Sequence, residues 1–272
     1  MKVRSHAKIN WALRITGRRA DGFHDLETLF QAISLHDDLT FEPAARLSLT
    51  CDDPLIPVDD TNLVIRAARA LGSPPVAIDL RKRIPSGGGL GGGSSNAAAT
   101  LMALDAMFEL KTSRVRMHEI ALQLGSDVPF FLDGGTAYAT GRGEALTPLA
   151  APSSEIALLL LIPEERVSTR EAFARITRYS KPAGIAAFRT ALTTDFLAHA
   201  DLLVNDFEEP IFAMLPRLGE LKRRLLEAGA AWAGMSGSGS TIAGAFRDAR
   251  SRDEAERAFD DVFGVRRVAA AF

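Results

Sequence analysis

The chain has 272 residues, 47% hydrophobic and 24% charged, which is the composition of a globular protein long enough for one large domain or two smaller ones. Its 32 basic and 34 acidic residues give a formal charge of −2, so no broad basic field is available to hold nucleic acid. The single cysteine, Cys51, excludes an internal disulfide and fits a reducing cytoplasm. Residues 1–15 carry charge throughout, and the apolar run at 156–163 is too short to span a bilayer. We therefore expect a cytoplasmic protein that binds neither nucleic acid nor membrane.

The first predicted element is a strand. Residues 2–15 alternate between apolar and polar side chains, which is the period of a strand with one buried and one polar face. Lys8 and Asn10 fall on the polar face, so they project from the same side. Asp21 and Gly22 follow as a strong turn signal.

Later elements follow from periodicity and capping residues. Further strands are expected at residues 37–43, 46–52, 75–85 and 156–163, and one more within 231–246 beside a second glycine run. Helices are expected at residues 61–71, 94–110, 113–125, 168–176, 193–203, 210–229 and 251–263. Thr61 or Asn62 would cap the first helix, and Ser94, Ser95 or Asn96 the second. The proline- and serine-bearing stretch at 147–155 predicts a boundary near residue 152, giving domains 1–152 and 153–272.

Residues 84–101, IPSGGGLGGGSSNAAATL, contain six glycines followed at once by alanines. Gly87, Gly89 and Gly92 match the dinucleotide pattern G-x-G-x-x-G, but the preceding strand alternates with charges instead of being buried on both faces. No acidic residue about 20 positions further on caps a strand, where it could bind a ribose, and no Gly-Lys-Ser/Thr completes a Walker motif. Neither standard nucleotide loop is present.

A glycine run still lets backbone N–H groups crowd into an anion-binding concavity. A helix opening at residues 94–97 would add unpaired N–H groups and a positive dipole end, and Ser86, Ser94 and Ser95 would add hydroxyls. The alternative is a structural loop whose glycines only join strand to helix. Six glycines carry a large entropic cost, so we favour phosphate binding.

Five motifs together resemble the GHMP kinase family, which acts on galactose, homoserine, mevalonate and phosphomevalonate. They are AKINWAL at 7–13, RADGFHDLETLFQ at 19–31, PSGGGLGGGSSNAAATL at 85–101, GSDVPFFLDGGTAYATGRGE at 125–144 and GMSGSGSTIAGAF at 234–246. The long glycine form GLGGGSSNAA resembles the branch that phosphorylates a cytidylyl sugar alcohol in the non-mevalonate route to isoprenoids. Phe23 is a departure, because the family commonly has tyrosine there.

The resemblance implies an α+β, two-domain GHMP kinase fold with an S5-like N-terminal domain and a ferredoxin-like C-terminal domain. It implies ATP and Mg²⁺ as cofactors and the 2-hydroxyl of the sugar alcohol as the phosphoryl acceptor. The catalytic pair would be Asp127, as the base, and Lys8, as its electrostatic partner. Without the resemblance, Lys8 would be a solvated strand lysine and Asp127 a turn aspartate.

The resemblance also implies binding residues. Those for ATP are Pro85, Ser86, Gly87, Gly88, Gly89, Leu90, Gly91, Gly92, Gly93, Ser94 and Ser95, with Asn62 and Leu63 for adenine. Those for the substrate are Asn10, Phe23, His24, Thr169 and Phe173. Phe23 and Phe173 would stack on the two faces of cytosine while His24 reads its edge; on periodicity alone, Phe173 would be a core residue.

Several points stay open at this stage. Mg²⁺ could be held by Ser94 or Ser95, or mainly by phosphates and water, and the five histidines show no paired spacing for zinc. Lys82 and Arg83 are expected to lie outside the phosphate loop. Rival interpretations are a GHMP kinase for mevalonate or homoserine, an inactive relative that only binds metabolites, and a nucleic-acid-binding module. The oligomeric state cannot be inferred.

Overall fold

A computed structural model describes all 272 residues, and they form two compact units. Unit 1 contains Met1–Ala7, Ser34–Ser86 and Gly91–Gly134, and unit 2 contains Lys8–Ile33, Gly87–Leu90 and Gly135–Phe272. The two longest strands, β1 (Lys2–Arg18) and β2 (His24–Pro43), pair with each other and supply residues to both units. The predicted boundary near residue 152 stays a prediction.

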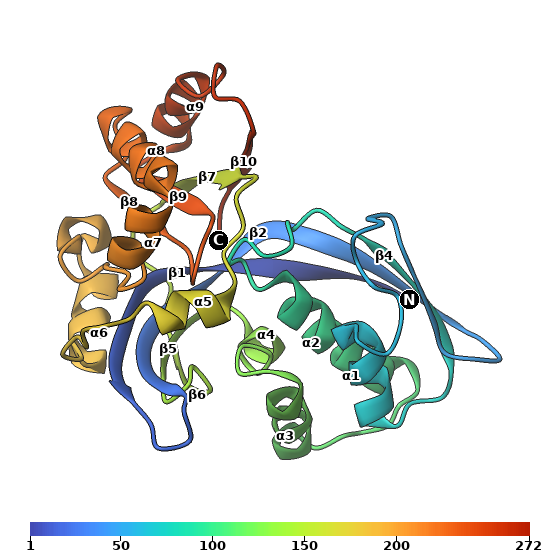
Figure 1. Ribbon diagram of the computed structural model, residues 1–272. Helices are drawn as coiled ribbons and strands as arrows, with labels where there is room; N and C mark the ends of the chain where they lie inside the picture. The colour runs from blue at the N-terminus through green and yellow to red at the C-terminus, as the bar shows by residue number, and fades with distance from the viewer. The chain divides into compact units, whose positions relative to one another are not determined.

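Unit 1 is a sheet with helices on one face (Figure 1). The second half of β2 pairs antiparallel with β4 (Val76–Arg81), and β4 pairs in parallel with β3 (Ser48–Cys51). The helices are α1 (Leu63–Leu71), α2 (Gly92–Met107), α3 (Arg114–Leu124) and the short α4 (Phe130–Asp133). Phe41, Ile78 and Leu104 are buried in the core between the sheet and the helices.

Unit 2 contains a second, fully antiparallel sheet of order β10-β7-β9-β8. Its strands are β7 (Ala157–Pro163), β8 (Trp232–Met235), β9 (Ile242–Phe246) and β10 (Val265–Ala270). Along the chain, β7 and β8 are separated by four helices: α5 (Thr169–Ala174), α6 (Ile185–Thr193), α7 (Glu208–Met214) and α8 (Pro216–Glu227). One helix, α9 (Ala249–Arg257), follows β9 and precedes β10 in the sequence. This β-α-β-β-α-β order is ferredoxin-like, as predicted.

Two further strands of unit 2 belong to the sheet that contains β2. β5 (Thr136–Thr140) pairs antiparallel with the first half of β2, and β6 (Ala145–Leu149) pairs antiparallel with β5. The mixture of largely antiparallel sheets and separate helices confirms the α+β class. None of the helices has both the length and the apolar character needed to cross a membrane.

The strand predictions needed three corrections. The single strand expected within residues 231–246 is two strands, β8 and β9, with the second glycine run between them. Residues 37–43 are not a separate strand, because β2 continues unbroken from His24 to Pro43 with Leu29, Ile33 and Leu39 all buried. The polar face of β1 is buried as well between Ala7 and Ile15, and only the two ends of that strand have exposed residues.

The helix predictions were right where capping signals were strong. Asn62 caps α1 by accepting a hydrogen bond from the N–H of Val64, and α3 ends at Gly125, as predicted. The predicted helix at 210–229 is broken into α7 and α8, because Pro216 has no N–H and begins a new helix. The segment 193–203 forms only a 3₁₀ helix, Phe196–His199.

Candidate active site

Lys8 is the best-defined predicted site residue, and it is buried rather than solvated. Its ammonium donates a hydrogen bond to Oδ1 of Asn10 at 2.6 Å and another to the carbonyl oxygen of Gly89 at 3.0 Å. It also lies 5.4 Å from the centre of the Phe30 ring, within the range of a cation–π interaction. A buried charge needs such partners, so Lys8 is fixed in position and directed at the glycine loop.

The glycine loop is joined to β1 and to the second glycine run within unit 2. The N–H of Lys8 donates to the carbonyl of Leu90 at 3.0 Å, and the Ser236 hydroxyl donates to the carbonyl of Gly89 at 2.9 Å. A Cβ on Gly89 would lie 2.0 Å from the carbonyl oxygen of Ser236, and Gly89 has φ +75°. Only glycine allows both that backbone conformation and that approach.

Helix α2 begins two residues earlier than predicted, inside the glycine run. Its N-cap is Gly91, with φ +71° and no side-chain cap, and its first residue is Gly92. The glycines therefore form the first turn themselves, which leaves that turn's N–H groups uncovered by side chains at Gly92 and Gly93. An anion-binding helix terminus needs this feature, so the phosphate-loop interpretation retains its physical basis.

The hydroxyl of Ser95 is already used within unit 1. It donates to the carbonyl of His6 at 2.6 Å and accepts from the Ser5 hydroxyl at 2.7 Å, and the residue is 3% exposed. Ser94, in contrast, is half-buried. Of the two hydroxyls considered for Mg²⁺, that of Ser94 is the better placed to contact a ligand.

Of the two residues predicted to bind adenine, Leu63 lies beside the start of α2. Asn62 uses its whole amide locally, since Oδ1 accepts from Val64 and Nδ2 donates to the carbonyl of Pro57 at 2.6 Å. Leu63 is the first residue of α1, and its Cδ1 is 3.7 Å from the Cβ position of Gly93. Within unit 1, the structure therefore brings Leu63 of the predicted adenine segment against Gly93 in the first turn of α2.

Lys82 was expected to lie outside the phosphate loop, yet its ammonium is 3.3 Å from the Cβ position of Gly92. It forms an ion pair with Asp37, which is fully buried. The other Asp37 oxygen accepts from the N–H groups of Arg83 and Ile84 at 2.6 and 2.8 Å. No local sequence pattern pairs residues 45 positions apart, so sequence reasoning could not detect this cluster.

Asp127 lies in unit 1, in the turn between α3 and α4, and is half-buried. The turn closes through a hydrogen bond from the N–H of Val128 to the carbonyl of Gly125 at 3.2 Å. No group of three or more His, Cys, Asp or Glu side chains is placed to hold a metal ion. The role of Asp127 as the base stays a prediction.

Two of the predicted substrate-binding residues, His24 and Phe173, form an aromatic cluster with Tyr179 in unit 2. The rings of His24 and Phe173 are stacked, with centroids 4.9 Å apart and planes 12° apart, and Tyr179 lies 6.3 Å from His24. Burial, with a smaller contribution from Arg18, lowers the pKa of His24 below its ordinary value of 6.5. The ring is therefore neutral at pH 7, with one nitrogen as donor and the other as acceptor.

Phe23 and Thr169 have different partners. The Phe23 ring is 52% exposed and lies under the guanidinium of Arg142, 4.8 Å from its carbon, while the Thr169 hydroxyl is 3.1 Å from that of Ser238. The ring of His24 covers one face of Phe173. Arg142 and Tyr179 were not predicted, because neither has a periodic or spacing signal.

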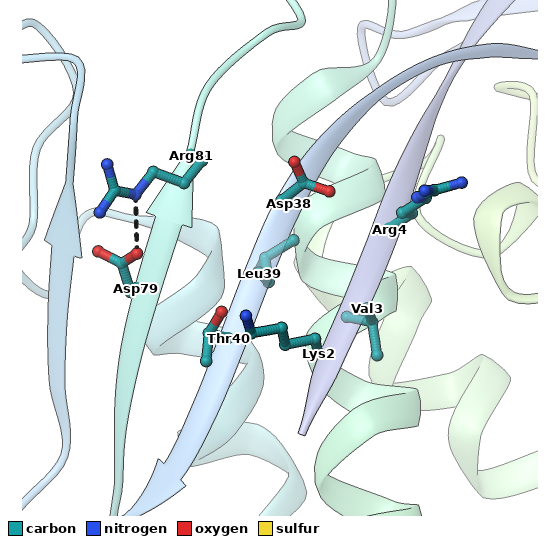
Figure 2. A pocket seen from close by; sticks show the side chains of 8 residues that line it. All are labelled: Lys2, Val3, Arg4, Asp38, Leu39, Thr40, Asp79 and Arg81. Carbon is teal, nitrogen blue, oxygen red and sulfur yellow. Dashed lines mark hydrogen bonds and ion pairs between the residues drawn. The ribbon is translucent and has the colours of Figure 1, made fainter.

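A shallow pocket lies elsewhere on unit 1, over the ends of three neighbouring strands. Figure 2 shows the side chains that line it: Lys2, Val3, Arg4, Asp38, Leu39, Thr40, Asp79 and Arg81. Arg81 donates to Asp79 at 2.9 Å, so part of its charge is neutralised internally. None of the predicted site residues lines this pocket, and we do not assign the reaction to it.

Two family models match this chain. The model of the GHMP kinases N-terminal domain matches residues 62–135, and that of the GHMP kinases C-terminal domain matches residues 186–264. These matches cover the first glycine loop and, in the ferredoxin-like part of unit 2, strands β8 and β9 with helices α7, α8 and α9. The chain belongs to the GHMP kinase family.

Proteins within the family differ in how similar they are to this chain. A protein of Chlorobium phaeobacteroides (strain BS1) named 4-diphosphocytidyl-2-C-methyl-D-erythritol kinase is 42% identical over 275 residues, covering 97% of this chain and 96% of that protein. A crystal structure of 4-(cytidine 5'-diphospho)-2C-methyl-D-erythritol kinase has a TM-score of 0.84 and 34% identity, with all of both chains covered. Mevalonate kinase of Methanococcus jannaschii, at 13% identity and a TM-score of 0.73 over 100% of this chain and 98% of that one, shares the fold alone.

Proposed function

We propose that this GHMP kinase transfers the γ-phosphoryl group of ATP to the 2-hydroxyl of 4-diphosphocytidyl-2-C-methyl-D-erythritol, a step of the non-mevalonate route to isoprenoids. The observation that carries the proposal is the buried ammonium of Lys8, which is held against the carbonyl of Gly89 in the glycine loop. A fixed cation at a phosphate-binding loop fits phosphoryl transfer, in which catalysis is mostly positioning and charge stabilisation. The relatives' names supply the substrate.

We assign the chemical roles as follows. Asp127 accepts the proton of the attacking hydroxyl, and Asn10 orients that hydroxyl from the same strand face as Lys8. A positioned base contributes about 10²–10⁴-fold, or roughly 3–5.5 kcal/mol of the barrier. Because the transition state is loose, the proton leaves late, and Lys8 together with the loop N–H groups supplies most of the stabilisation.

Mg²⁺ accompanies ATP in this proposal and neutralises charge on its phosphates. The chain offers oxygen donors but no cluster of carboxylates, and the Ser95 hydroxyl is already bonded to His6. These donors fit an ion that keeps most of its water and phosphate ligands, with the Ser94 hydroxyl as the ligand from α2.

Base recognition in this proposal uses the aromatic cluster. Phe23 and Phe173 stack on the cytosine, His24 reads its edge as a neutral ring, and Thr169 contacts the substrate. Stacking alone accepts any base, so the preference for cytosine comes from His24. We also propose that the enzyme acts in the cytoplasm, where its single cysteine, Cys51, would stay reduced.

The experiment that tests the function is identification of the product. The purified chain, ATP, Mg²⁺ and 4-diphosphocytidyl-2-C-methyl-D-erythritol are incubated and followed by ³¹P NMR. We expect one new phosphomonoester signal, coupled to ADP formation and assigned to the 2-position. ADP without a new phosphomonoester would be simple ATP hydrolysis, and that result would contradict the proposal.

A further inference from the structure

Three buried side chains on β1 and β2 form a continuous hydrogen-bond chain. Thr28 donates its hydroxyl proton to the carbonyl of Ala12 at 2.6 Å, and its oxygen accepts from Nδ2 of Asn10 at 2.8 Å. Oδ1 of Asn10 then accepts from the ammonium of Lys8 at 2.6 Å. Thr28, Asn10 and Lys8 are 1%, 2% and 3% exposed, so water does not compete for these bonds.

The direction of every bond in this chain follows from its two ends. The carbonyl of Ala12 can only accept, so it takes the single hydroxyl proton of Thr28. The Thr28 oxygen is then left as an acceptor, and only the NH₂ group of Asn10 can face it. The amide oxygen must therefore face Lys8, whose ammonium can only donate.

We infer that Thr28 is a positioning residue for phosphoryl transfer, which orients the Asn10 amide so that its oxygen holds the ammonium of Lys8. The inference rests on the proposed function, since the position of Lys8 matters only if Lys8 acts on the transferred group. Thr28 touches neither reactant in this account and acts through Asn10.

Removing the hydroxyl would weaken the whole chain. In Thr28→Val the side chain keeps its shape, but Nδ2 of Asn10 loses its acceptor inside the protein. Rotation of the amide does not repair the loss, because it would turn the NH₂ group toward the Lys8 ammonium. Asn10 must shift instead, and Lys8 then loses the amide oxygen that accepts from its ammonium at 2.6 Å.

The test compares two substitutions at one position. We expect Thr28→Val to lower kcat about 10- to 100-fold, because misplacing a catalytic group by up to about one ångström has an effect of that size. KM for ATP and KM for the acceptor should stay nearly unchanged. Thr28→Ser restores a hydroxyl and should retain most of kcat. A Val variant with the kcat of the parent, or a Ser variant as slow as the Val variant, would overturn the inference.

Thr136→Val is the matched control, because Thr136 is also a buried threonine of unit 2 but donates to Gln31 at 2.7 Å instead of to the Lys8 chain. Thr136→Val should keep the kcat of the parent while losing about as much thermal stability as Thr28→Val loses. In an Asn10→Ala background, Thr28→Val should cause no further loss of kcat, because the residue through which Thr28 acts is gone. A second full loss there would show a general structural effect and contradict the inference.

Two other outcomes remain decisive. If Thr28→Val does not fold, Thr28→Ala replaces it, and equal kcat in the Ala and Ser variants would overturn the inference. A parent protein that is inactive with the cytidylyl substrate but active with mevalonate or homoserine would refute the proposed substrate. The same variants, measured with the acceptor that is used, would then still test the role of Thr28.

Discussion

Nζ of Lys8 and the carbonyl oxygen of Gly89 lie 3.0 Å apart, so one hydrogen bond joins the candidate catalytic lysine to the glycine loop. The same carbonyl accepts from Ser236 of the second glycine run. The two glycine motifs, represented here by Gly89 and Ser236 at 147 positions apart, are therefore linked at the point where Lys8 is held.

Gly89→Ala should damage this link severely. Its Cβ would meet the Ser236 carbonyl at 2.0 Å, and the left-handed backbone itself would cost about 1–2 kcal/mol. We expect a lower melting temperature and at least about a tenfold fall in kcat/KM, because the loop must move away from Lys8. Gly17→Ala is the control: its Cβ has no neighbour within 4 Å, and it should leave both quantities nearly unchanged.

The catalytic contributions of Lys8 and Asp127 should depend on each other. Asp127→Asn keeps the shape and removes the basicity, so we expect kcat to fall about 10²–10⁴-fold with near-normal ATP affinity. Lys8→Met should lose a similar amount, because it keeps the apolar stem without the charge. Steady-state kinetics of the double variant should show a combined loss much smaller than the product of the two. Full multiplicativity would mean that the two residues act independently.

The ion pair of Asp37 and Lys82 should be important for stability. Asp37→Ala would leave a largely buried ammonium and two backbone N–H groups without their acceptor, and we expect a loss of about 3–5 kcal/mol in the free energy of unfolding. Denaturant titration measures it. Asp60→Ala, which removes the exposed ion pair with Arg69, should cost no more than about 1 kcal/mol. Equal losses in the two variants would contradict this account.

His24 predicts a pH dependence of substrate binding. Burial lowers its pKa, so the ring is neutral at pH 7 and gains its proton only below its ordinary value of 6.5. Protonation removes the acceptor nitrogen, so KM for the cytidylyl substrate should rise as the pH falls through this lowered pKa, while KM for ATP does not follow. The unfolded chain takes up the same proton at higher pH, so His24 also makes folding less favourable as the pH drops.

Substitution of His24 shows whether this residue, rather than another titrating group, causes the pH dependence of substrate binding. His24→Ala should remove this pH dependence and reduce the preference for the cytosine substrate over its uracil analogue. His118→Ala should retain both, since His118 lies on α3 and pairs with Asp133. Phe23→Ala should weaken substrate binding by about 1–3 kcal/mol, as expected for loss of a stacked base. Unchanged discrimination in His24→Ala would place base recognition elsewhere.

The sequence predicted what depends on local signals. Asn62 as a cap, Gly125 as a helix end and the glycine run before α2 all depend on residues a few positions apart. The break at Pro216 had a local signal that the helix prediction overlooked. The GHMP kinase motifs then supplied the family, which periodicity alone could not have done.

Other features depend on contacts between distant segments. The burial of Lys8 follows from its bonds to Asn10 and Gly89, and the polar face of β1 gives no sign of the second partner. The Asp37–Lys82 pair and the stacking of His24 on Phe173 likewise join residues far apart in the chain. Residue types and spacing could name these side chains, but only the fold shows which of them meet.

The most direct test of the central claim is a comparison of kcat/KM for three acceptors, measured as ADP formation with saturating ATP and Mg²⁺. The acceptors are 4-diphosphocytidyl-2-C-methyl-D-erythritol, mevalonate and homoserine. The account predicts turnover with the cytidylyl substrate and a kcat/KM at least about 10³-fold below it for the other two, because neither can fill a base site. Equal or higher kcat/KM with mevalonate or homoserine would contradict it.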